Sequence, residues 1–357
     1  MKTYIKFIIT IFFKSFLFVS SIFLSLVLIL NILTEIEFFK DLNVEAYLPI
    51  YVSFLNSPDL LFEMFPFIFL VSTQVFFINI LKENQIQIFK YSGLKNTKIL
   101  QILGLTSFIT GLIIIILFYS LSSNLKNIYF KIKNKYTTDD KYLAVITNNG
   151  LWIKDTFNNK INIVHAKKMN NNYLNEAFIT QFDSEYTVLR HIQSNNVNIQ
   201  NKEWVLIDAQ IYENNISNKV NFFKIKTNFD YEKIQSLFSN LSSLTIVELV
   251  KLRENYSSLN YSTIDVDIQL HKIISYPFYL FTMTFLSALI MFNTKRFASR
   301  TIKISIGLFC SVVIYYIYNF FIVMGQTEKL SVEISVWSPI LILIISNVLF
   351  SYKLNEK

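Results

Sequence analysis

The chain is poor in the residues that build several common kinds of site. Cys310 is the one cysteine among 357 residues, so neither an intrachain disulfide nor a cluster of thiolate metal ligands can form. The three histidines, His165, His191 and His271, lie far apart and lack the spacing of a metal-binding motif. We therefore expect no metal site and no cofactor.

Glycine is also scarce, and its placement excludes a nucleotide-binding loop. None of the six glycines falls at the G-x-x-x-x-G-K-[ST] spacing that cradles phosphates in P-loop proteins. Acidic side chains in the polar middle of the chain, such as Asp155 and Asp183, lack a recognisable nucleophile and base beside them. We expect no catalytic residue, and no ATP hydrolysis by this chain itself.

Hydrophobic residues are abundant instead. They make up 52% of the sequence, aromatic residues make up 16%, and the mean hydropathy is positive, which is typical of a membrane protein. The net charge of +8 comes from lysines and arginines that often lie beside apolar runs. This pattern indicates orientation in a membrane and does not favour nucleic acid as a partner.

Six apolar runs are long enough for transmembrane helices, which need about 20 residues to cross a ~30 Å hydrocarbon core. They are residues 15–33, 60–81, 99–120, 273–292, 302–323 and 335–352. Lysines before the first run also suit a signal peptide, but that run is too long and no small-residue cleavage site follows. The first run is therefore expected to remain as a span.

The short loops predict the orientation. Segments 82–98 and 293–303 are rich in lysine and arginine, whereas 34–59 and 324–334 are mainly acidic. Because basic loops prefer the cytoplasm, both termini are expected inside and the long polar middle outside.

That middle, residues 122–243, is expected to form an all-β domain. Apolar and polar residues alternate in six runs: 142–147, 151–155, 160–166, 186–192, 203–212 and 221–229. Asparagine-rich clusters separate them at 148–150, 158–159, 170–172, 195–196 and 201–202. Turns every 8 to 12 residues or so between period-2 runs are typical of an antiparallel sandwich or barrel.

A helical return segment is expected at 244–271, before the last three spans in 272–357. Ser242 or Ser243 is the predicted N-cap, with Glu248 following. The predicted apolar side consists of Leu244, Val247, Val250 and Leu252. Residues 1–121 hold the first three spans.

Segment 82–98, between the second and third spans, is short, polar and amphipathic in its middle. Gly93 suits the left-handed end of a short helix. Such a helix could lie against a partner protein, or it could rest on lipid headgroups with its lysines extended toward them.

Several residues together resemble the permease subunits of the lipopolysaccharide exporter, the LptF/LptG family, and LptG more closely than LptF. The resemblance covers the whole chain. It rests on Pro66, 91–94 (Tyr-Ser-Gly-Leu), 150–155 (Gly-Leu-Trp-Ile-Lys-Asp), 203–206 (Glu-Trp-Val-Leu), Pro277, Gly325, and 337–339 (Trp-Ser-Pro). The string at 150–155 is the most specific.

The resemblance implies a permease subunit of an ABC transporter in the bacterial inner membrane, with a periplasmic β-jellyroll-like domain. Its implied partners are an LptF-like permease chain, a pair of LptB-like cytoplasmic ATPases and LptC- or LptA-like bridge proteins. The implied cargo is lipopolysaccharide, taken from the inner membrane for export to the outer membrane.

Segment 82–98 would then be the coupling helix that receives motion from an ATPase. The resemblance assigns this contact to Glu83, Gln85, Ile88, Lys90, Ser92 and Gly93. Two departures stand out. Gln85 occupies a position where the family usually has glutamate, and Lys40 stands with Glu35 and Glu37 where LptG members carry several basic residues.

The spans are expected to carry almost no buried charge, which argues against a proton-coupled carrier. They are rich in aromatic residues, which either pack or face lipid, or else line an acyl groove. We expect the lipid path between two permease chains, with the first and fifth spans as lateral gates. The expected contacts are Lys40, Tyr315, Asn319 and Phe321.

Two other functions fit the same pattern. A permease-like chain could use ATPase motion to act on an extracytoplasmic partner without moving lipid. A membrane-anchored assembly factor could use its β domain only to dock proteins, with no nucleotide-binding partner.

Overall fold

The computed structural model describes residues 3–42, 44–82, 94–133, 135–136, 151–157, 160–170, 172–213, 216–231, 234, 240–258, 262–293 and 300–355. The chain divides into two compact units. Met1–Lys126 together with Ile264–Lys357 form the helical unit, and Asn127–Thr263 form the β unit.

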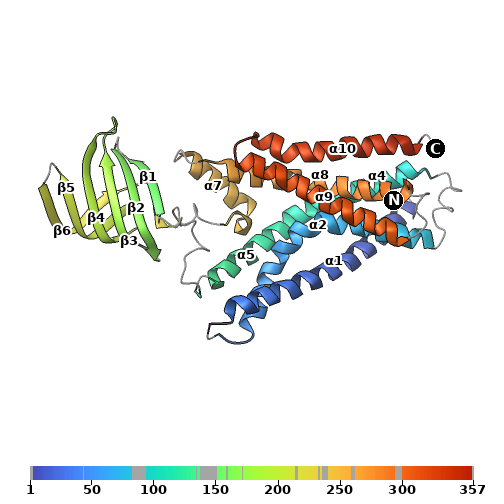
Figure 1. Cartoon of the computed structure of the whole chain (residues 1–357), viewed down its shortest axis with the longest axis horizontal. Helices are drawn as coiled ribbons and strands as arrows, with labels where there is room; N and C mark the ends of the chain where they lie inside the picture. The colour runs from blue at the N-terminus through green and yellow to red at the C-terminus, as the bar shows by residue number, and fades with distance from the viewer. Residues whose placement is uncertain are drawn as a thin grey trace. The chain divides into compact units, whose positions relative to one another are not determined.

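The helical unit contains the six predicted spans, which are confirmed as six helices long and apolar enough to cross a membrane. Their bounds are α1 (Thr3–Phe39), α2 (Leu48–Lys82), α4–η1–α5 (Asn96–Ile113, Ile114–Tyr119, Ser120–Lys133), α8 (Ile264–Asn293), α9 (Arg300–Gln326) and α10 (Val332–Asn355). Each extends beyond its apolar run, because helix-forming polar residues at the ends continue the hydrogen-bonded backbone. Figure 1 shows α1 and α10 at opposite sides of this unit.

The centre of the helical unit lies among α2, α8, α9 and α10. Tyr279 and Tyr318 stack there with ring centroids 5.0 Å apart. Aliphatic side chains surround the two rings: Leu70, Ile268, Met283, Ile314, Ile322, Val336 and Ile340. The most apolar windows of α2 and α8 are 61% and 67% buried, against 17% for α1. The second and fourth spans therefore form the interior, and the first lies outside it.

The third span is interrupted by a π-helical segment, η1, between α4 and α5. Just before it, α4 approaches α8 so closely that a Cβ on Gly111 would lie 3.0 Å from the Cα of Pro277. Only glycine fits this contact without movement of the backbone. π-helical turns are uncommon and often occur at functional sites.

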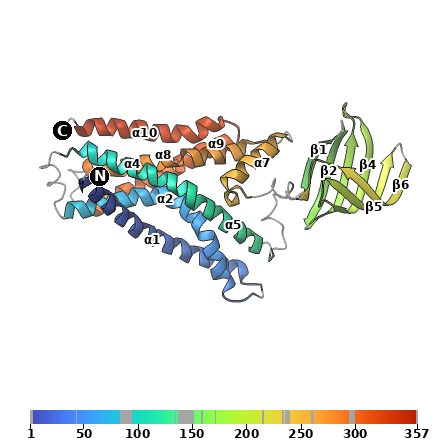
Figure 2. The same cartoon turned by 180° about the vertical axis from the view of Figure 1, so that it is seen from behind.

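The β unit contains six antiparallel strands. Their bounds are β1 (Leu151–Phe157), β2 (Lys160–Asn170), β3 (Tyr173–Phe182), β4 (Val188–Asn198), β5 (Glu203–Glu213) and β6 (Ile216–Lys226). Each strand pairs with the next in sequence, which gives one curved sheet in the order β1-β2-β3-β4-β5-β6 (Figure 2). The predicted all-β insertion is confirmed. Among the described strands it is a meander in a single sheet, without the second layer expected of a sandwich.

The strand predictions agree with the structure in four places and differ in others. The runs at 151–155, 160–166, 186–192 and 203–212 coincide with β1, β2, β4 and β5, and the run at 221–229 overlaps β6. The run at 142–147 lies outside the described residues. Strand β3 was missed, and the turn predicted at Asn195 and Asn196 is wrong. Asn196 lies within β4 because it pairs with Asn175, whose Nδ2 donates to its Oδ1 at 3.2 Å.

One face of the sheet is buried. Ile153, Val164, Ile179 and Ile192 stand side by side across four strands, and each is at most 2% exposed. Trp204, 1% exposed, donates from Nε1 to the carbonyl of Phe229 at 2.9 Å. This bond fastens the segment after β6 to the buried face.

Asp183 organises the turn between β3 and β4. Its carboxylate accepts hydrogen bonds from the hydroxyl and backbone N–H of Thr187 and from the N–H of Glu185. These bonds, chiefly those from Thr187, lower the pKa of Asp183. Their stabilisation is present above the unfolded-state pKa and is lost as the pH falls through the folded-state pKa.

The predicted return helix is α7 (Ile246–Ser258), which follows the short 3-10 helix η2 (Leu241–Ser243). The predicted caps Ser242 and Ser243 are wrong, because both belong to η2. Thr245 caps α7: its N–H and hydroxyl both donate to Glu248 Oε2 at 2.8 Å. The N–H of Glu248 donates back to Thr245 Oγ1 at 3.4 Å, and this reciprocal arrangement is a capping box.

The apolar side of α7 also differs from the prediction. Leu244 and Leu252 are buried as expected, whereas Val247 and Val250 are 64% and 42% exposed. Leu249, which was not predicted, is fully buried. Leu249 and Leu252, three residues apart, lie on the same side of the helix, and Val247 and Val250 project away from it.

Candidate functional site

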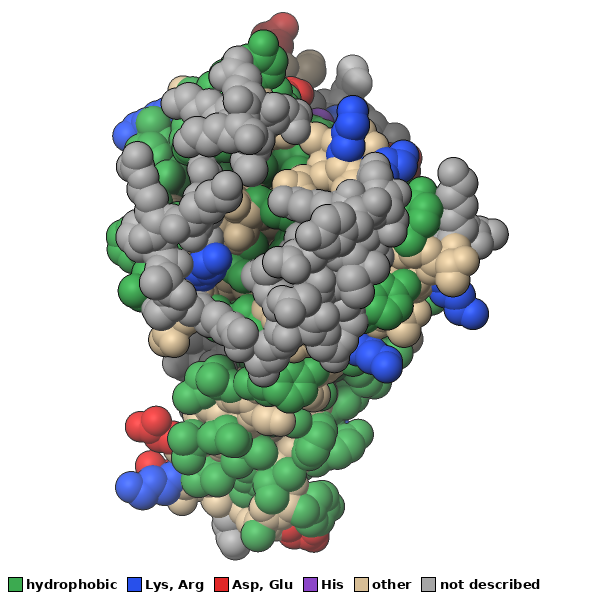
Figure 3. Space-filling model, turned by 90° about the vertical axis from the view of Figure 1, so that its right-hand side faces the viewer, with side chains coloured by type: hydrophobic (Ala, Val, Ile, Leu, Met, Phe, Trp, Pro, Cys, Tyr) green, Lys and Arg blue, Asp and Glu red, His purple; other side chains and the backbone are tan. Residues whose placement is uncertain are grey.

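Helix α1 attaches to the helical unit along one narrow seam. Its buried residues recur about once per turn: Ile8, Phe12, Ser15, Val19, Val27, Asn31, Glu35 and Phe39. Large apolar side chains on its other faces are open, with Leu17 65%, Ile29 60% and Leu33 60% exposed. In the space-filling view, hydrophobic side chains cover most of the lower part of the face, where α1 and the start of α2 lie (Figure 3). Most of α1 is thus available to lipid or to another chain.

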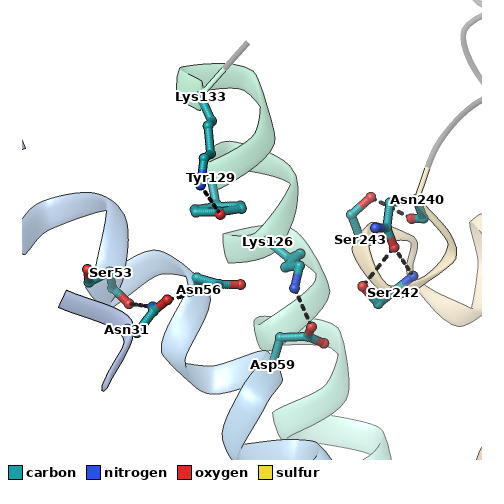
Figure 4. Close-up of polar contacts among 10 residues, drawn as sticks. All are labelled: Asn31, Ser53, Asn56, Asp59, Lys126, Tyr129, Lys133, Asn240, Ser242 and Ser243. Carbon is teal, nitrogen blue, oxygen red and sulfur yellow. Dashed lines mark hydrogen bonds and ion pairs between the residues drawn. The ribbon is translucent and has the colours of Figure 1, made fainter. Parts of the chain in front are cut away.

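A polar contact holds the seam near the C-terminal end of α1. Asn31 Nδ2 donates to the carbonyl of Ser53 at 2.9 Å, and Asn56 Nδ2 donates to Asn31 Oδ1 at 3.1 Å. All three residues are at most 7% exposed. Figure 4 shows them pointing toward one another from α1 and α2. We call these three residues the polar joint. It gives α1 a fixed register on α2, where apolar packing alone would permit sliding.

Helix α9 has one buried and one open face. Ile314, Tyr318 and Ile322 point into the core and are at most 9% exposed. The opposite stripe is the most open part of the helix: Phe309, Tyr316 and Phe320 are 71%, 69% and 61% exposed. The window of α9 is 28% buried, the same share as in α10. The fifth and sixth spans therefore share the outward exposure that α1 shows more strongly.

The three residues predicted on α9 lie beside these faces. Tyr315 is 41% exposed and its ring centroid lies 6.1 Å from that of Phe67 on α2. Asn319 and Phe321 are half-buried. The structure thus brings Tyr315 to the boundary between α9 and α2, while Asn319 and Phe321 flank the exposed Phe320.

Near its start, α9 is fastened to α2. The side chain of Gln74, fully buried, donates from Nε2 to the carbonyl of Lys303 at 2.9 Å. Gly307, one turn further, leaves room for that amide, since a Cβ there would lie 1.9 Å from Nε2.

We expect Gly307→Ala to displace Gln74 and to destabilise the protein by about 1–3 kcal/mol, the usual cost of overpacking. This outweighs the gain in helix propensity of about 1 kcal/mol. Thermal unfolding in detergent measures the change. Gln74→Ala in the same chain removes the clash, so the double variant should be less destabilised than the sum of the two single variants. Additive effects would contradict the contact.

Charged residues gather in the first half of α2, in α5 and in the first part of α8. Lys126 Nζ of α5 lies 2.7 Å from Asp59 Oδ2 of α2, and the side chains are 12% and 7% exposed (Figure 4). Glu63, one turn after Asp59, lies within electrostatic reach of Asp59, Lys126 and Lys272. We call these four residues the charged cluster.

The sequence predicts almost no buried charge within the spans, and the acidic residues that the structure buries in this region lie just beyond the predicted runs 15–33 and 60–81. Asp59 is 5% and Glu35 1% exposed. The hydropathy windows missed them because the helices extend beyond the apolar runs, and these residues lie in the extensions or at their edges. The sequence signal that could have identified these buried residues is the presence of single asparagines and acidic residues beside the apolar runs.

Lys40 lies just after the end of α1 and is exposed. Its N–H donates to the carbonyl of Glu37 at 3.4 Å. Among the described residues no ion pair joins the Lys40 and Glu37 side chains, so the ammonium group points to the surroundings of the helix end.

The coupling residues Glu83, Gln85, Ile88, Lys90, Ser92 and Gly93 lie outside the described residues. Their flanks are described: α2 ends at Lys82, and α4 begins at Asn96 after an extended Lys95. The segment therefore joins two span helices directly.

Two of the motif strings have structural roles within the β unit. Trp204, of the string at 203–206, is the first of them. Asp155, of the string at 150–155, is 2% exposed, and its carboxylate accepts hydrogen bonds from the backbone N–H and Nδ2 of Asn228. Trp337, of the string at 337–339, donates from Nε1 to His271 Nδ1 at 3.2 Å and so ties α10 to α8. Trp152 differs from them, since it is 58% exposed. Within the described part of the chain, no group of three or more histidine, cysteine or acidic residues could hold a metal ion.

Comparison with protein-family profiles gives one match. The profile described as lipopolysaccharide export system permease LptF/LptG matches residues 6–353. None of the curated proteins compared with this chain matches it.

Proposed function

Since this chain belongs to the lipopolysaccharide export system permease LptF/LptG family, whose profile spans residues 6–353, we propose that it is the LptG-type subunit of the exporter. Family membership makes the chain a multi-pass inner-membrane permease for lipopolysaccharide. The Gly-Leu-Trp-Ile-Lys-Asp string at 150–155 supports the LptG assignment over the LptF one. The observation that carries the proposal is the match along nearly the whole chain, with six spans flanking an inserted β-sheet.

The proposed lipid path lies between this chain and an LptF-like partner chain. A single six-helix chain with its interior filled by Tyr279, Tyr318 and their aliphatic neighbours has no room for a multi-acyl lipid. The open faces of α1 and α9 supply the apolar surface that acyl chains need, and they are our proposed lateral gates. Lys40, exposed at the outer end of α1, suits an anionic headgroup at that level.

The motor is proposed to be a separate pair of LptB-like cytoplasmic ATPases that dock on segment 82–98. The basic character of 82–98 and 293–303 supports a cytoplasmic position for both loops and for both termini. The β unit, which lies in sequence between the third and fourth spans, is then periplasmic and is proposed to pass lipid to LptC- or LptA-like bridge proteins.

The proposal is tested by photo-crosslinkers at Tyr315, Asn319 and Phe321 in the complete exporter reconstituted with lipopolysaccharide. We expect lipid capture at these three positions, with a yield that changes when ATP is added. Leu117, 67% exposed in the third span, is the matched control because it is an exposed apolar residue outside the two proposed gate helices.

The gate assignment would be contradicted if the crosslinking yield at Tyr315, Asn319 and Phe321 equalled that at Leu117 and did not change when ATP was added. Export that continues without any ATPase would contradict the wider proposal.

A further inference from the structure

The face of the β-sheet opposite the buried one is an ordered polar and aromatic surface. Two adjacent rows of directly paired residues cross all six strands on this face. The first row is Trp152, His165, Phe178, Gln193, Gln210 and Lys219, and the second is Lys154, Ile163, Thr180, His191, Tyr212 and Ser217. None of the twelve is buried. We call this surface the outer face.

Three rings begin the first row. Trp152 and His165 have centroids 4.3 Å apart with planes inclined by 36°, and His165 and Phe178 have centroids 6.4 Å apart with planes inclined by 26°. Trp152 and Phe178 are 58% and 46% exposed. The short distance between Trp152 and His165 and the small inclinations mean that the three rings stack one beside the next across the strands.

Packing in the core explains why the residues that alternate with Trp152 along β1 are apolar or buried, but it does not explain Trp152 itself. Leu151, Ile153 and Asp155 are at most 2% exposed and hold the sheet to its core. Trp152 stabilises the pairing of β1 with β2 through its contact with His165. That contact leaves more than half of the residue exposed, and Trp152 and Phe178 in the same row together expose apolar surface of the kind that marks binding sites.

The rest of the outer face supplies hydrogen-bonding groups and positive charge. Gln193 and Gln210 continue the first row, and Gln210 Nε2 donates to Ser217 Oγ at 3.1 Å. Thr180 Oγ1 lies 3.0 Å from His191 Nδ1. The twelve positions include Lys154 and Lys219 and no carboxylate. An anionic molecule meets no repulsive side chain within the two rows.

We propose that the outer face binds the saccharide part of lipopolysaccharide, an inference that rests on the proposed function. The apolar C–H face of a sugar ring is attracted to the electron-rich face of an aromatic ring. Its hydroxyls need donors and acceptors of the kind that amide and hydroxyl side chains provide. Phosphate or carboxylate groups on the sugars gain charge-assisted contacts with Lys154 and Lys219.

The composition of the outer face favours a saccharide over a protein partner. Aromatic anchors in protein interfaces sit in well-packed, desolvated pockets. Here the stacked rings are partly exposed, and their row continues into two amides and a lysine. Exposed aromatic side chains beside hydrogen-bonding groups and positive charge match a chain of anionic sugar rings.

The test uses the intact chain in lipid nanodiscs and lipopolysaccharide from which the acylated part has been removed by mild acid. Saturation-transfer NMR and a titration give the dissociation constant of the remaining saccharide. We expect Trp152→Ala and Phe178→Ala each to weaken binding by about tenfold. Phe222→Ala is the matched control, because Phe222 is 70% exposed on β6 but belongs to neither row, and it should leave binding unchanged.

Near-ultraviolet circular dichroism of each variant verifies that the sheet remains folded. Absence of saccharide binding to the parent chain would overturn the inference, as would equal losses in all three variants. Loss of a co-purifying protein from Trp152→Ala, without any saccharide binding, would overturn it in favour of a protein-docking face. Lipid capture by the crosslinkers on α9 in the complete exporter separates the two proposals, since it can persist when saccharide binding is absent.

Discussion

Replacing Lys126 with methionine is expected to destabilise the helical unit by about 3–5 kcal/mol, the usual cost of removing one partner from a buried ion pair. The Lys126 and Asp59 side chains are only 12% and 7% exposed, and their charged atoms lie 2.7 Å apart. The variant leaves the Asp59 carboxylate in its buried position beside Glu63, which carries the same charge. Thermal unfolding of the purified chain in detergent measures the loss.

The two partners of this pair should respond unequally. Asp59→Asn removes a negative charge near Glu63 as well as the attraction to Lys126, so it should cost less than Lys126→Met. The double variant Asp59→Asn/Lys126→Met should recover part of the loss, because no unpaired charge remains from the pair. Lys40→Met changes an exposed lysine and serves as the matched control. A melting temperature for Lys126→Met equal to that of Lys40→Met would contradict a structural role for the pair.

The helical architecture was predictable because membrane insertion imposes a strong and local constraint. A run of about 20 apolar residues has few alternatives to a spanning helix, since unsatisfied backbone groups are costly in hydrocarbon. All six runs are helices in the structure. Hydropathy located the centres of the six helices but not their ends. The polar end turns of α1, α2 and α5 are helical because of helix propensity and tertiary packing.

The β unit shows where local patterns fail. β3 carries Asn175 and Glu176 near its start, and Glu176 has a positive φ of 50°, an irregularity that breaks the period-2 pattern. Asn196 was interpreted as a turn residue on its own propensity, yet cross-strand pairing with Asn175 keeps it within β4. Both errors arise because strand partners are distant in sequence.

The candidate site likewise contains features that could be predicted from the sequence and features that could not. Exposed aromatic residues on α9 could be predicted from its apolar run. Which of them are buried, such as Tyr318, and which are exposed, such as Tyr316, could be seen only from the packed helix. The polar joint between Asn31 and Asn56, and the contact of Gln74 with α9, depend on residues brought together by folding. No motif or residue spacing in the sequence predicts these contacts.

These contacts make α2 the connecting element of the helical unit. Side-chain contacts link it to four other span helices: Asn31 of α1 with Ser53, Lys126 of α5 with Asp59, Tyr276 and Ser287 of α8 with Phe62 and Leu70, and Lys303 of α9 with Gln74. α2 also ends at Lys82, where segment 82–98 begins. A displacement applied to that segment would therefore reach both proposed gate helices, α1 and α9, through one continuous helix.

We accordingly expect Ile88→Pro to uncouple ATP hydrolysis from lipopolysaccharide release in the reconstituted exporter. Proline inside a helix costs about 3 kcal/mol and removes a backbone donor, so the proposed coupling helix would break while α2 and its partners stay packed. Lipid release should fall to the background level, and ATP hydrolysis should continue. Ile88→Ala, which keeps the helix, is the matched control, and Lys90→Glu should uncouple through charge reversal. Undiminished release by Ile88→Pro would mean that motion enters the spans elsewhere, with 293–303 as the next basic loop to examine.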